Sequence, residues 1–114
     1  MENFIRINDY MKQGNLVLIP FPFTDLTSTK VRPALVISKD IGDEDLIILP
    51  ISSHRLGDSF KITTKDMAKG ALPLISYVRF TKVATLHNSL VRKIIGDLDK
   101  NVFGRIILKF KSQF

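Results

Sequence analysis

Residues 15–38 read NLVLIPFPFTDLTSTKVRPALVIS and contain two short apolar runs with a polar loop between them. The runs at 15–19 and 33–37 are too short for independent helices and include β-branched residues, so they predict buried β-strands. The prolines, threonines and serine between the runs supply turn-forming residues and hydroxyl groups. We therefore expect a strand, a polar loop and a second strand, with the cationic Arg32 at the root of the second strand.

Short apolar segments recur after this stretch, with turn residues between them. The pattern predicts a mainly β fold in which one small sheet curls on itself. Because closure protects the exposed edges of strands, we expect a small SH3-like or OB-like barrel closed by a C-terminal helix. The predicted strands are 15–21, 32–38, 45–51, 59–63, 71–79, 81–86 and 93–97, and the predicted turns are 42–43, 55–58, 68–70 and 87–89.

The last segment of the chain has a helical pattern. Asp99 is a suitable N-cap for a helix that starts at Lys100, because its carboxylate can accept hydrogen bonds from first-turn N–H groups. Apolar residues then recur at helical spacing, which predicts one buried face. Gly104 weakens this helix but does not interrupt the apolar face. The predicted face consists of Phe103, Ile106, Ile107 and Phe110.

The composition is typical of one small domain without covalent cross-links. The chain has 114 residues, of which 45% are hydrophobic, and this is enough for a single core. With no cysteine and only two histidines, we expect no disulfide, no metal and no cofactor. No segment resembles a signal peptide or a membrane span, so we expect a cytoplasmic protein without membrane contact. We expect residues 1–13 to form a leader and residues 14–114 a single domain.

The charge balance favours an acidic partner. The chain has 17 Lys and Arg against 11 Asp and Glu, which gives a net charge of +6 at pH 7. For so small a domain this bias indicates binding to a polyanion, and nucleic acid is the obvious candidate. The alternative is that the basic surface serves only solubility.

Two places in the sequence carry candidate catalytic side chains. Arg32 presents a planar cation that matches phosphate oxygens, although an ion pair with Asp25 or Glu44 is an equally common use of such a residue. Ser52 and Ser53 follow an apolar strand, and strand alternation would send their side chains to opposite faces. One hydroxyl can therefore contact a phosphate while the other caps the next turn, or both can satisfy loop backbone.

Common catalytic patterns are missing from the sequence. There is no Walker loop, no Rossmann glycine fingerprint and no nucleophile elbow. The acidic cluster at 43–45 is more typical of a solvated turn than of a magnesium site. Adjacent serine and histidine at 52–54 are no evidence for a triad, because triad members meet through the fold. A serine-type hydrolase is therefore not predicted.

At these residues the chain resembles the MazF/PemK toxins of type II toxin-antitoxin systems, which are mRNA endoribonucleases. Nearly the whole chain from Gly14 onward fits the resemblance. It rests on 14–26 (GNLVLIPFPFTDL), 30–38 (KVRPALVIS) and 49–53 (LPISS), and more loosely on 76–79 (SYVR) with the terminal helix.

The resemblance implies a fold, partners and a reaction. The fold is an SH3-like barrel, and the assembly is a homodimer with single-stranded RNA in a groove at the subunit interface. An antitoxin, here expected to be acidic, would occupy that groove with its tail. The reaction is metal-independent transfer of the RNA phosphodiester to its own 2′-hydroxyl, which leaves a cyclic phosphate and a free 5′-hydroxyl.

The resemblance also places functional residues. The arginine of the family's Arg-Pro motif falls on Arg32, and its strand-end Thr or Ser falls on Ser52, with Ser53 next to it. Arg32 would stabilise the phosphoryl oxygens and Ser52 would donate a hydrogen bond to the same group. His54 stands where many relatives have glutamine, and either His54 or Asp25 is the candidate for proton transfer.

RNA contacts are expected mainly from the polar loop and nearby cations. Phe21 and Phe23 can stack on bases, or they can hold the loop against the core. Many relatives have an acidic residue in the loop nearer to the arginine, whereas this chain has Thr or Ser at 27–29. The complete set of expected RNA-binding residues is Phe21, Phe23, Thr24, Thr27, Lys30, Arg55 and Arg79.

Two other functions remain open at this point. The same barrel occurs in CcdB-type toxins, which bind DNA gyrase without cutting nucleic acid, and the pairing of Arg32 with Ser52 speaks against that reading. A catalytically silent nucleic-acid-binding barrel is the third possibility, but it would leave the loop and arginine arrangement unexplained.

Overall fold

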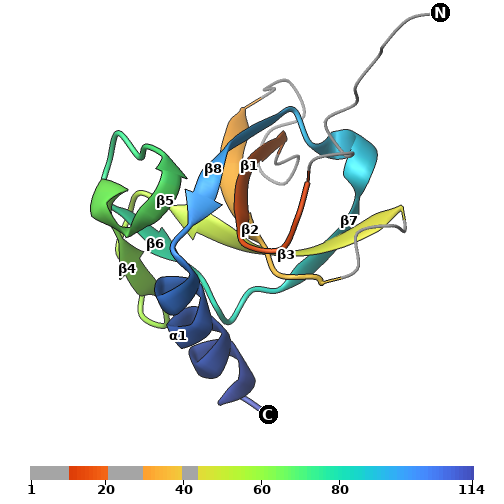
Figure 1. The fold of residues 1–114 in the computed structure, drawn as a ribbon. Helices are drawn as coiled ribbons and strands as arrows, with labels where there is room; N and C mark the ends of the chain where they lie inside the picture. The colour runs from red at the N-terminus through yellow and green to blue at the C-terminus, as the bar shows by residue number, and fades with distance from the viewer. Residues whose placement is uncertain (1–10, 21–29, 40–43) are drawn as a thin grey trace, which may run out of the picture.

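A sheet and a C-terminal helix account for nearly all regular structure in the part of the protein that the structure describes. The computed structural model describes residues 11–20, 30–39 and 44–114. Within these residues eight strands form one antiparallel sheet, followed by a C-terminal helix (Figure 1). The strands are β1 (Asn15–Pro20), β2 (Val31–Val36), β3 (Asp45–Ser52), β4 (Phe60–Ile62), β5 (Met67–Gly70), β6 (Ser76–Val78), β7 (Ala84–His87) and β8 (Lys93–Leu98), the short 3-10 turns are η2 (Thr64–Asp66) and η3 (Asn88–Leu90), and the helix is α1 (Lys100–Lys111).

The strand order is β4-β6-β3-β2-β1-β8-β5, with β7 also paired to β3. In Figure 1 the strands β1, β2, β3, β7 and β8 curl around one side of the molecule, while β4, β6 and α1 lie on the other side. The two apolar runs at 15–19 and 33–37 form the neighbouring strands β1 and β2, which pair in the register Leu16↔Leu35 to Pro20↔Val31. The prediction of a mainly β fold with one C-terminal helix is confirmed.

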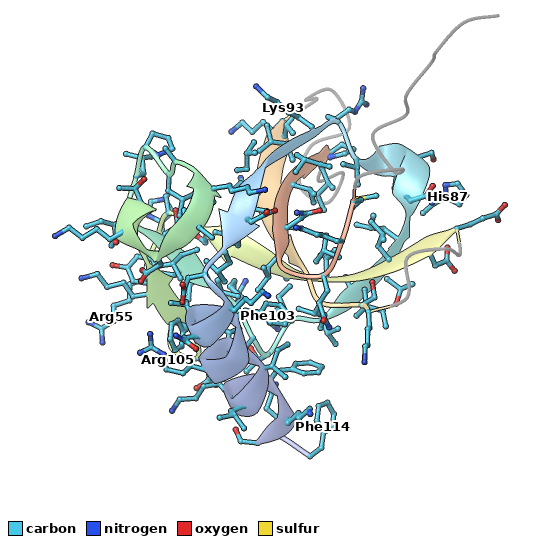
Figure 2. The ribbon with its side chains drawn as sticks, viewed as in Figure 1. Arg55, His87, Lys93, Phe103, Arg105 and Phe114 are labelled. Carbon is cyan, nitrogen blue, oxygen red and sulfur yellow. The ribbon has the colours of Figure 1, made fainter. Side chains whose placement is uncertain are left out.

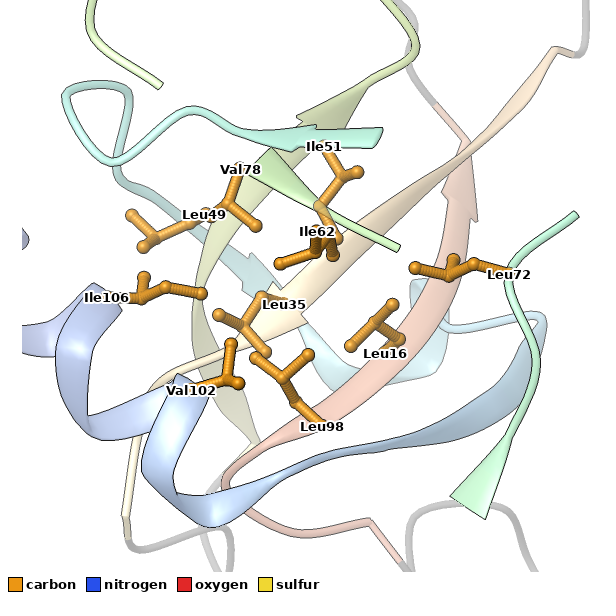
Figure 3. Close-up of a cluster of buried hydrophobic side chains, with 10 residues drawn as sticks. All are labelled: Leu16, Leu35, Leu49, Ile51, Ile62, Leu72, Val78, Leu98, Val102 and Ile106. Carbon is orange, nitrogen blue, oxygen red and sulfur yellow. The ribbon is translucent and has the colours of Figure 1, made fainter. Parts of the chain in front are cut away.

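Strands β1, β2 and β3 are buried on both faces, because alternate side chains enter two separate apolar clusters. On one face lie Leu16, Leu35 and Leu49, which belong to the first cluster (Figure 3). The opposite face contributes Val17 and Ala34 to the second cluster, together with residues of β7 and β8. Burial on two faces explains why these strands read as continuous apolar runs rather than alternating ones.

Helix α1 covers the first cluster. Its N-cap is Asp99, whose Oδ2 accepts hydrogen bonds from the backbone N–H groups of Asn101 (3.0 Å) and Val102 (3.2 Å). Val102 and Ile106 are the buried helical residues. Phe103 and Phe110 of the predicted apolar face pack partly buried against the same cluster. The predicted cap and helix start are therefore confirmed, and Val102 adds to the predicted face.

The segment before β1 is tied to the sheet by polar contacts. Asn15 is buried; its Oδ1 accepts a hydrogen bond from the backbone N–H of Lys12 (2.6 Å), and its Nδ2 donates to Asp97. The Nζ of Lys12 lies 3.4 Å from the other Asp97 oxygen. Met11 is buried in the second cluster. Residues 11–13 of the expected leader thus pack with the domain, and residues 1–10 lie outside the described residues.

Two local predictions between residues 68 and 79 are wrong. Residues 68–70, predicted as a turn, belong to strand β5, which pairs with β8. The predicted strand 71–79 is shortened to β6, and residues 71–75 form a loop. Pro73 lacks a backbone N–H and cannot join a sheet ladder there, which explains the loop. The predicted turn at 42–43 lies outside the described residues.

Strand β5 approaches β8 so closely that both facing residues are glycines. Gly70 pairs with Gly96 and has a φ of +81°. A Cβ on Gly96 would lie 2.3 Å from the backbone oxygen of Lys69, and one on Gly70 would lie 2.3 Å from that of Ile95. Glycine is therefore required by the contact between the strands and does not mark a turn.

Replacing Gly96 with alanine is expected to destabilise the protein. The added methyl group would force β5 away from β8, and overpacking of this kind costs about 1–3 kcal/mol. Urea unfolding followed by circular dichroism would measure the change in the free energy of unfolding. Gly57→Ala is the matched control, because a Cβ at Gly57 meets no atom within 4 Å. Equal stability of the two variants would contradict the close approach.

Candidate nucleic-acid interface

A groove of about 560 Å³ lies where β2 begins and β3 ends. Its walls are mainly apolar and come from β1, β2, the end of β3, the loop 71–75 and β8. The polar residues on it are two cations, Lys30 and Arg32, and two hydroxyls, Ser53 and Ser76. Among the described lining residues there is no carboxylate and no imidazole. The apolar lining consists of Leu18, Val31, Pro33, Ile51, Ala71, Leu72, Pro73, Leu74 and Ile95.

Arg32 is placed by the pairing of β1 with β2. It stands opposite Ile19, one residue inside the start of β2, and is exposed. The next residues, Pro33 and Ala34, are progressively more buried, so the backbone that holds Arg32 is fixed by the core. Of the two expected ion pairs, the one with Glu44 is not seen among the described residues, where Glu44 lies near His87 (3.8 Å), and Asp25 lies outside them. Arg32 itself lines the groove.

The two serines at the end of β3 have different surroundings. Ser52 is half-buried, and its Oγ accepts a hydrogen bond from the backbone N–H of His54 at 3.0 Å. Ser53 is exposed and lines the groove with Arg32. Ser52 therefore caps the turn, as expected for one of the pair. Its own O–H remains available to donate a hydrogen bond, because a hydroxyl can accept and donate at once.

The observed pairing of β2 with β3 ends before it reaches Arg32 and Ser52. Strand β2 pairs with β3 through Val36↔Ile48, Leu35↔Leu49 and Ala34↔Pro50. Beyond Pro50, strand β3 pairs with β6, where Ser52 stands opposite Tyr77. Arg32 therefore shares the groove with Ser53, whereas Ser52 is the neighbour of Ser53 and does not line the groove.

The remaining predicted site residues are dispersed. Lys30 lines the groove. His54 and Arg55 are exposed in the turn after β3 and do not line the groove. Arg79 is half-buried at the end of β6, and its Nε is buried without a hydrogen-bond partner in the described part of the chain. The other candidates, Phe21, Phe23, Thr24, Asp25 and Thr27, lie outside the described residues.

Sequence reasoning missed the wall of the groove formed by the loop 71–75. Leu72 and Leu74 line it from this loop and Ser76 from the start of β6, where the Ser76 hydroxyl donates to the backbone oxygen of Leu74 (3.0 Å). The presence of Pro73 within a predicted strand could have indicated this loop. Strand β8 adds Ile95 to the groove lining, and this residue reaches the groove because β8 pairs with β1, which is distant in the sequence.

A comparison with protein-family models matches residues 12–114 to the PemK-like, MazF-like toxins of type II toxin-antitoxin systems. The chain belongs to this family. The match spans the whole sheet, the groove and α1, and it confirms the resemblance drawn from Gly14 onward. A sequence comparison with curated proteins gives no match.

Solved structures of MazF toxins share the fold. A MazE-MazF complex from Deinococcus radiodurans is similar with a TM-score of 0.72 and 19% identity, over 90% of this chain and 94% of that chain. The Mycobacterium tuberculosis toxin MazF-mt6 gives 0.67 and 16%, over 86% and 93%. A mycobacterial endoribonuclease in complex with its cognate antitoxin gives 0.65 and 14%, over 90% and 92%.

No helix in residues 11–20, 30–39 and 44–114 has the length and apolar character needed to cross a membrane. In the same ranges, no three His, Asp or Glu side chains lie close enough together to hold a metal ion.

Proposed function

We propose that this toxin is an endoribonuclease that cleaves single-stranded RNA without a metal, by attack of the ribose 2′-hydroxyl on the adjacent phosphodiester. The observation that supports it best is the presence of Arg32 and Ser53 on one groove, with Ser52 next to Ser53 at the end of β3. The endoribonuclease among the proteins of similar fold adds to this support.

The reaction needs little from the protein because the substrate supplies its own nucleophile. The 2′-oxygen forms a bond to phosphorus while the bond from phosphorus to the 5′-oxygen breaks. The 2′-hydroxyl loses a proton, the departing 5′-oxygen gains one, and the products are a cyclic phosphate and a 5′-hydroxyl. Negative charge grows on the phosphoryl oxygens during attack, so fixed hydrogen-bond donors beside them lower the barrier.

The groove offers donors suited to that charge. The guanidinium of Arg32 can donate two parallel hydrogen bonds to phosphoryl oxygens and keeps its charge throughout. The hydroxyls of Ser53 and Ser52 add neutral donors at the end of β3. Lys30 extends the positive wall and would attract the RNA backbone.

The proton acceptor is a separate question, because the described lining residues include neither carboxylate nor imidazole. Arginine does not readily give up its proton, so Arg32 is not assigned this role. His54 does not line the groove of a single chain. We assign proton transfer to Asp25 of the polar loop or to solvent, and a rate that is unchanged in Asp25→Asn would select solvent.

The partners follow from the same assignment. We propose a cytoplasmic homodimer whose activity is blocked by a cognate antitoxin with an acidic segment. The net charge of +6 favours such a segment, and it favours RNA for the same reason. The sequence at which RNA is cut would be set by side chains around the groove.

The test is cleavage of defined oligonucleotides by the purified protein. A single-stranded RNA should be cut in the presence of EDTA, whereas the DNA of the same sequence should survive because it lacks the 2′-hydroxyl. A DNA oligonucleotide with one ribonucleotide at the mapped site should also be cut, with a cyclic phosphate at its new 3′ end. Loss of cleavage in EDTA, or cleavage of the all-DNA strand, would refute the mechanism.

The same preparation tests the two other functions. Inhibition of gyrase supercoiling without RNA cleavage would identify a CcdB-like toxin. Tight, salt-sensitive RNA binding without product would identify a silent binding domain.

Alanine variants of Ser52 and Ser53 are expected to separate a role in RNA cleavage from a role in stability. Ser53→Ala should lower the cleavage rate roughly 10- to 100-fold. This is the effect on the rate of losing a hydrogen bond to a charged group, which contributes about 1.5–3 kcal/mol. Its stability should not change, because the Ser53 side chain is exposed. Ser52→Ala should lower the rate and also the free energy of unfolding, by about 0.5–1.5 kcal/mol, because the cap on His54 is lost.

Single-turnover kinetics and urea unfolding would measure both effects. Ser59→Ala is the control, since the Ser59 hydroxyl donates to the backbone oxygen of Leu56 and lies outside the groove lining. A rate that is unchanged in either variant at 52 or 53 would remove that hydroxyl from the site.

A further inference from the structure

Strands β4, β6 and β3 place a row of polar side chains on one face of the sheet. Tyr77 of β6 stands opposite Lys61 of β4 on one side and opposite Ser52 of β3 on the other. Residues directly opposite each other in an antiparallel pair lie on the same face, with their Cβ atoms about 4.5–5.5 Å apart. We call Lys61, Tyr77 and Ser52 the polar row.

The polar row faces away from the core. Its neighbours along the three strands are apolar residues that are buried in the first cluster, namely Ile51, Ile62 and Val78. Because side chains alternate along a strand, the polar row lies on the opposite face of these strands from α1, which covers that cluster. Lys61 is exposed, and the other two members are half-buried. The core therefore does not explain an aromatic residue in the middle of the polar row.

Positive charge surrounds Tyr77. The backbone N–H of Arg79 donates to the backbone oxygen of Pro50 (2.9 Å), so the ladder between β6 and β3 continues and Arg79 shares the face of Tyr77. Figure 2 shows Arg55, from the turn after β3, on the same side of the molecule as β4 and β6. In the described part of the chain, Lys61, Arg79 and Arg55 take part in no ion pair. An aromatic ring among cations on a sheet face is typical of surfaces that bind single-stranded RNA.

We infer that the polar row is a platform for the nucleotide next to the cleaved phosphate, whose base stacks on Tyr77 while Lys61 binds the following phosphate. The inference rests on the proposed function, in which Ser52 donates a hydrogen bond to the reacting phosphate. An acidic peptide would also be attracted by the cations, but it has no planar base to place on the tyrosine ring.

The spacing of the strands suits one nucleotide. Neighbouring strands lie about 4.8 Å apart, so the backbones at Ser52 and Lys61 are separated by about 10 Å, with Tyr77 halfway between them. The groove is lined by Ile51 and Ser53, so by alternation Ser52 faces the other side of β3. An RNA strand that passes the end of β3 can therefore contact Arg32 and Ser53 in the groove and then continue over the polar row.

The platform is expected to add affinity without changing the chemical step. Stacking on an aromatic ring tolerates every base, because each base has a π-face. Tyr77 makes the same contact before and during attack, and such uniform binding does not lower the barrier of the reaction. This separates Tyr77 from Arg32 and Ser52, which are proposed to act on the rate.

The test begins with binding of a short fluorescein-labelled RNA that carries 2′-deoxyribose at the mapped cleavage position and so cannot react. Fluorescence anisotropy should give a Kd that is roughly 5- to 150-fold higher for Tyr77→Leu, the usual effect of losing one stacked base. Tyr77→Phe keeps the ring, so its Kd should stay within about threefold of the parent value. With unmodified RNA, the single-turnover rate constant at saturating protein should be unchanged in both variants.

Lysine variants test the phosphate contact and do not depend on the folding of a tyrosine variant. Lys61→Ala should weaken binding and reduce the slope of log Kd against log salt by about 0.7, the value for one phosphate contact on a single strand. Lys39→Ala is the matched control, because Lys39 is also exposed but follows the end of β2, whereas Arg32 lies near its start. The salt slope of Lys39→Ala should equal that of the parent protein.

A fluorescent base locates the platform along the RNA. When 2-aminopurine replaces each base near the cleaved phosphate in turn, its fluorescence should be quenched on binding at the position that stacks on Tyr77. This quenching should be lost in Tyr77→Leu and retained in Lys61→Ala.

The inference and the proposed function can fail separately. Normal cleavage together with an unchanged Kd in Tyr77→Leu, or quenching that persists in this variant, would overturn the platform and leave the nuclease. If the RNA is bound but not cleaved, the unmodified RNA becomes the probe, and weaker binding by Tyr77→Leu would support the platform without the nuclease. Absence of RNA binding by the parent protein would overturn the platform. Dissociation of a dimer by Tyr77→Leu, measured by sedimentation, would also overturn it and assign the polar row to a contact between subunits.

Discussion

Arg32→Ala is expected to lower the RNA cleavage rate by on the order of 100-fold to 1,000-fold while the protein remains folded. Arg32 is exposed, so within the described residues its removal leaves no cavity and no buried partner without a hydrogen bond. The loss should appear in the single-turnover rate constant, because in the proposed mechanism the guanidinium acts on charge that develops during attack. RNA affinity should fall less, since Lys30 and the apolar walls remain.

Arg105→Ala serves as the matched control for this variant. Arg105 is also an exposed arginine, but it lies on α1 outside the groove lining. Its cleavage rate should stay within about threefold of the parent rate, since a surface substitution away from the site changes a free energy by only about 0.5 kcal/mol. Arg32→Lys separates charge from geometry, because lysine keeps the charge but loses the planar fork. A normal rate in Arg32→Ala would withdraw the role proposed for this residue.

The largest expected effect on stability is at Leu35. Its side chain is 0% exposed, in the middle of the first cluster between β1, β3 and α1. Leu35→Ala should lower the free energy of unfolding by about 2–5 kcal/mol, from lost burial and from the cavity left in the core. Urea unfolding at one fixed protein concentration would measure it, because association makes apparent stability depend on concentration.

The same substitution at an exposed leucine isolates the effect of burial. Leu108 is 68% exposed, so Leu108→Ala should change the free energy of unfolding by no more than about 0.5 kcal/mol. If the two leucine variants lost equal stability, the assignment of the first cluster as the core would be wrong.

Much of the fold could be predicted because its strongest patterns are local. The apolar runs at 15–19 and 33–37 and the cap at Asp99 each depend on neighbours in sequence. The wrong predictions have non-local causes. Gly70 resembles a turn residue until Gly96, 26 positions later, is seen to face it across β5 and β8.

The residues of the candidate site likewise divide into those predicted from local patterns and those that depend on distant segments. Arg32 and the serine pair were found because they stand at the ends of recognisable strands. Which serine shares the groove with Arg32 depends on how β3 leaves the sheet, and alternation gives only their opposite faces. The wall from 71–75 was missed because a loop has no periodic pattern.

Burial of β1, β2 and β3 between two clusters has a consequence for how this toxin can be inhibited. Arg32 and Ser53 flank the buried parts of β2 and β3, and opening those parts would expose both cores and approach the cost of complete unfolding. An inhibitor gains little by trying to deform such a rigid support. Inhibition should therefore act by blocking access to the arginine, and the toxin should regain activity as soon as the inhibitor dissociates or is degraded.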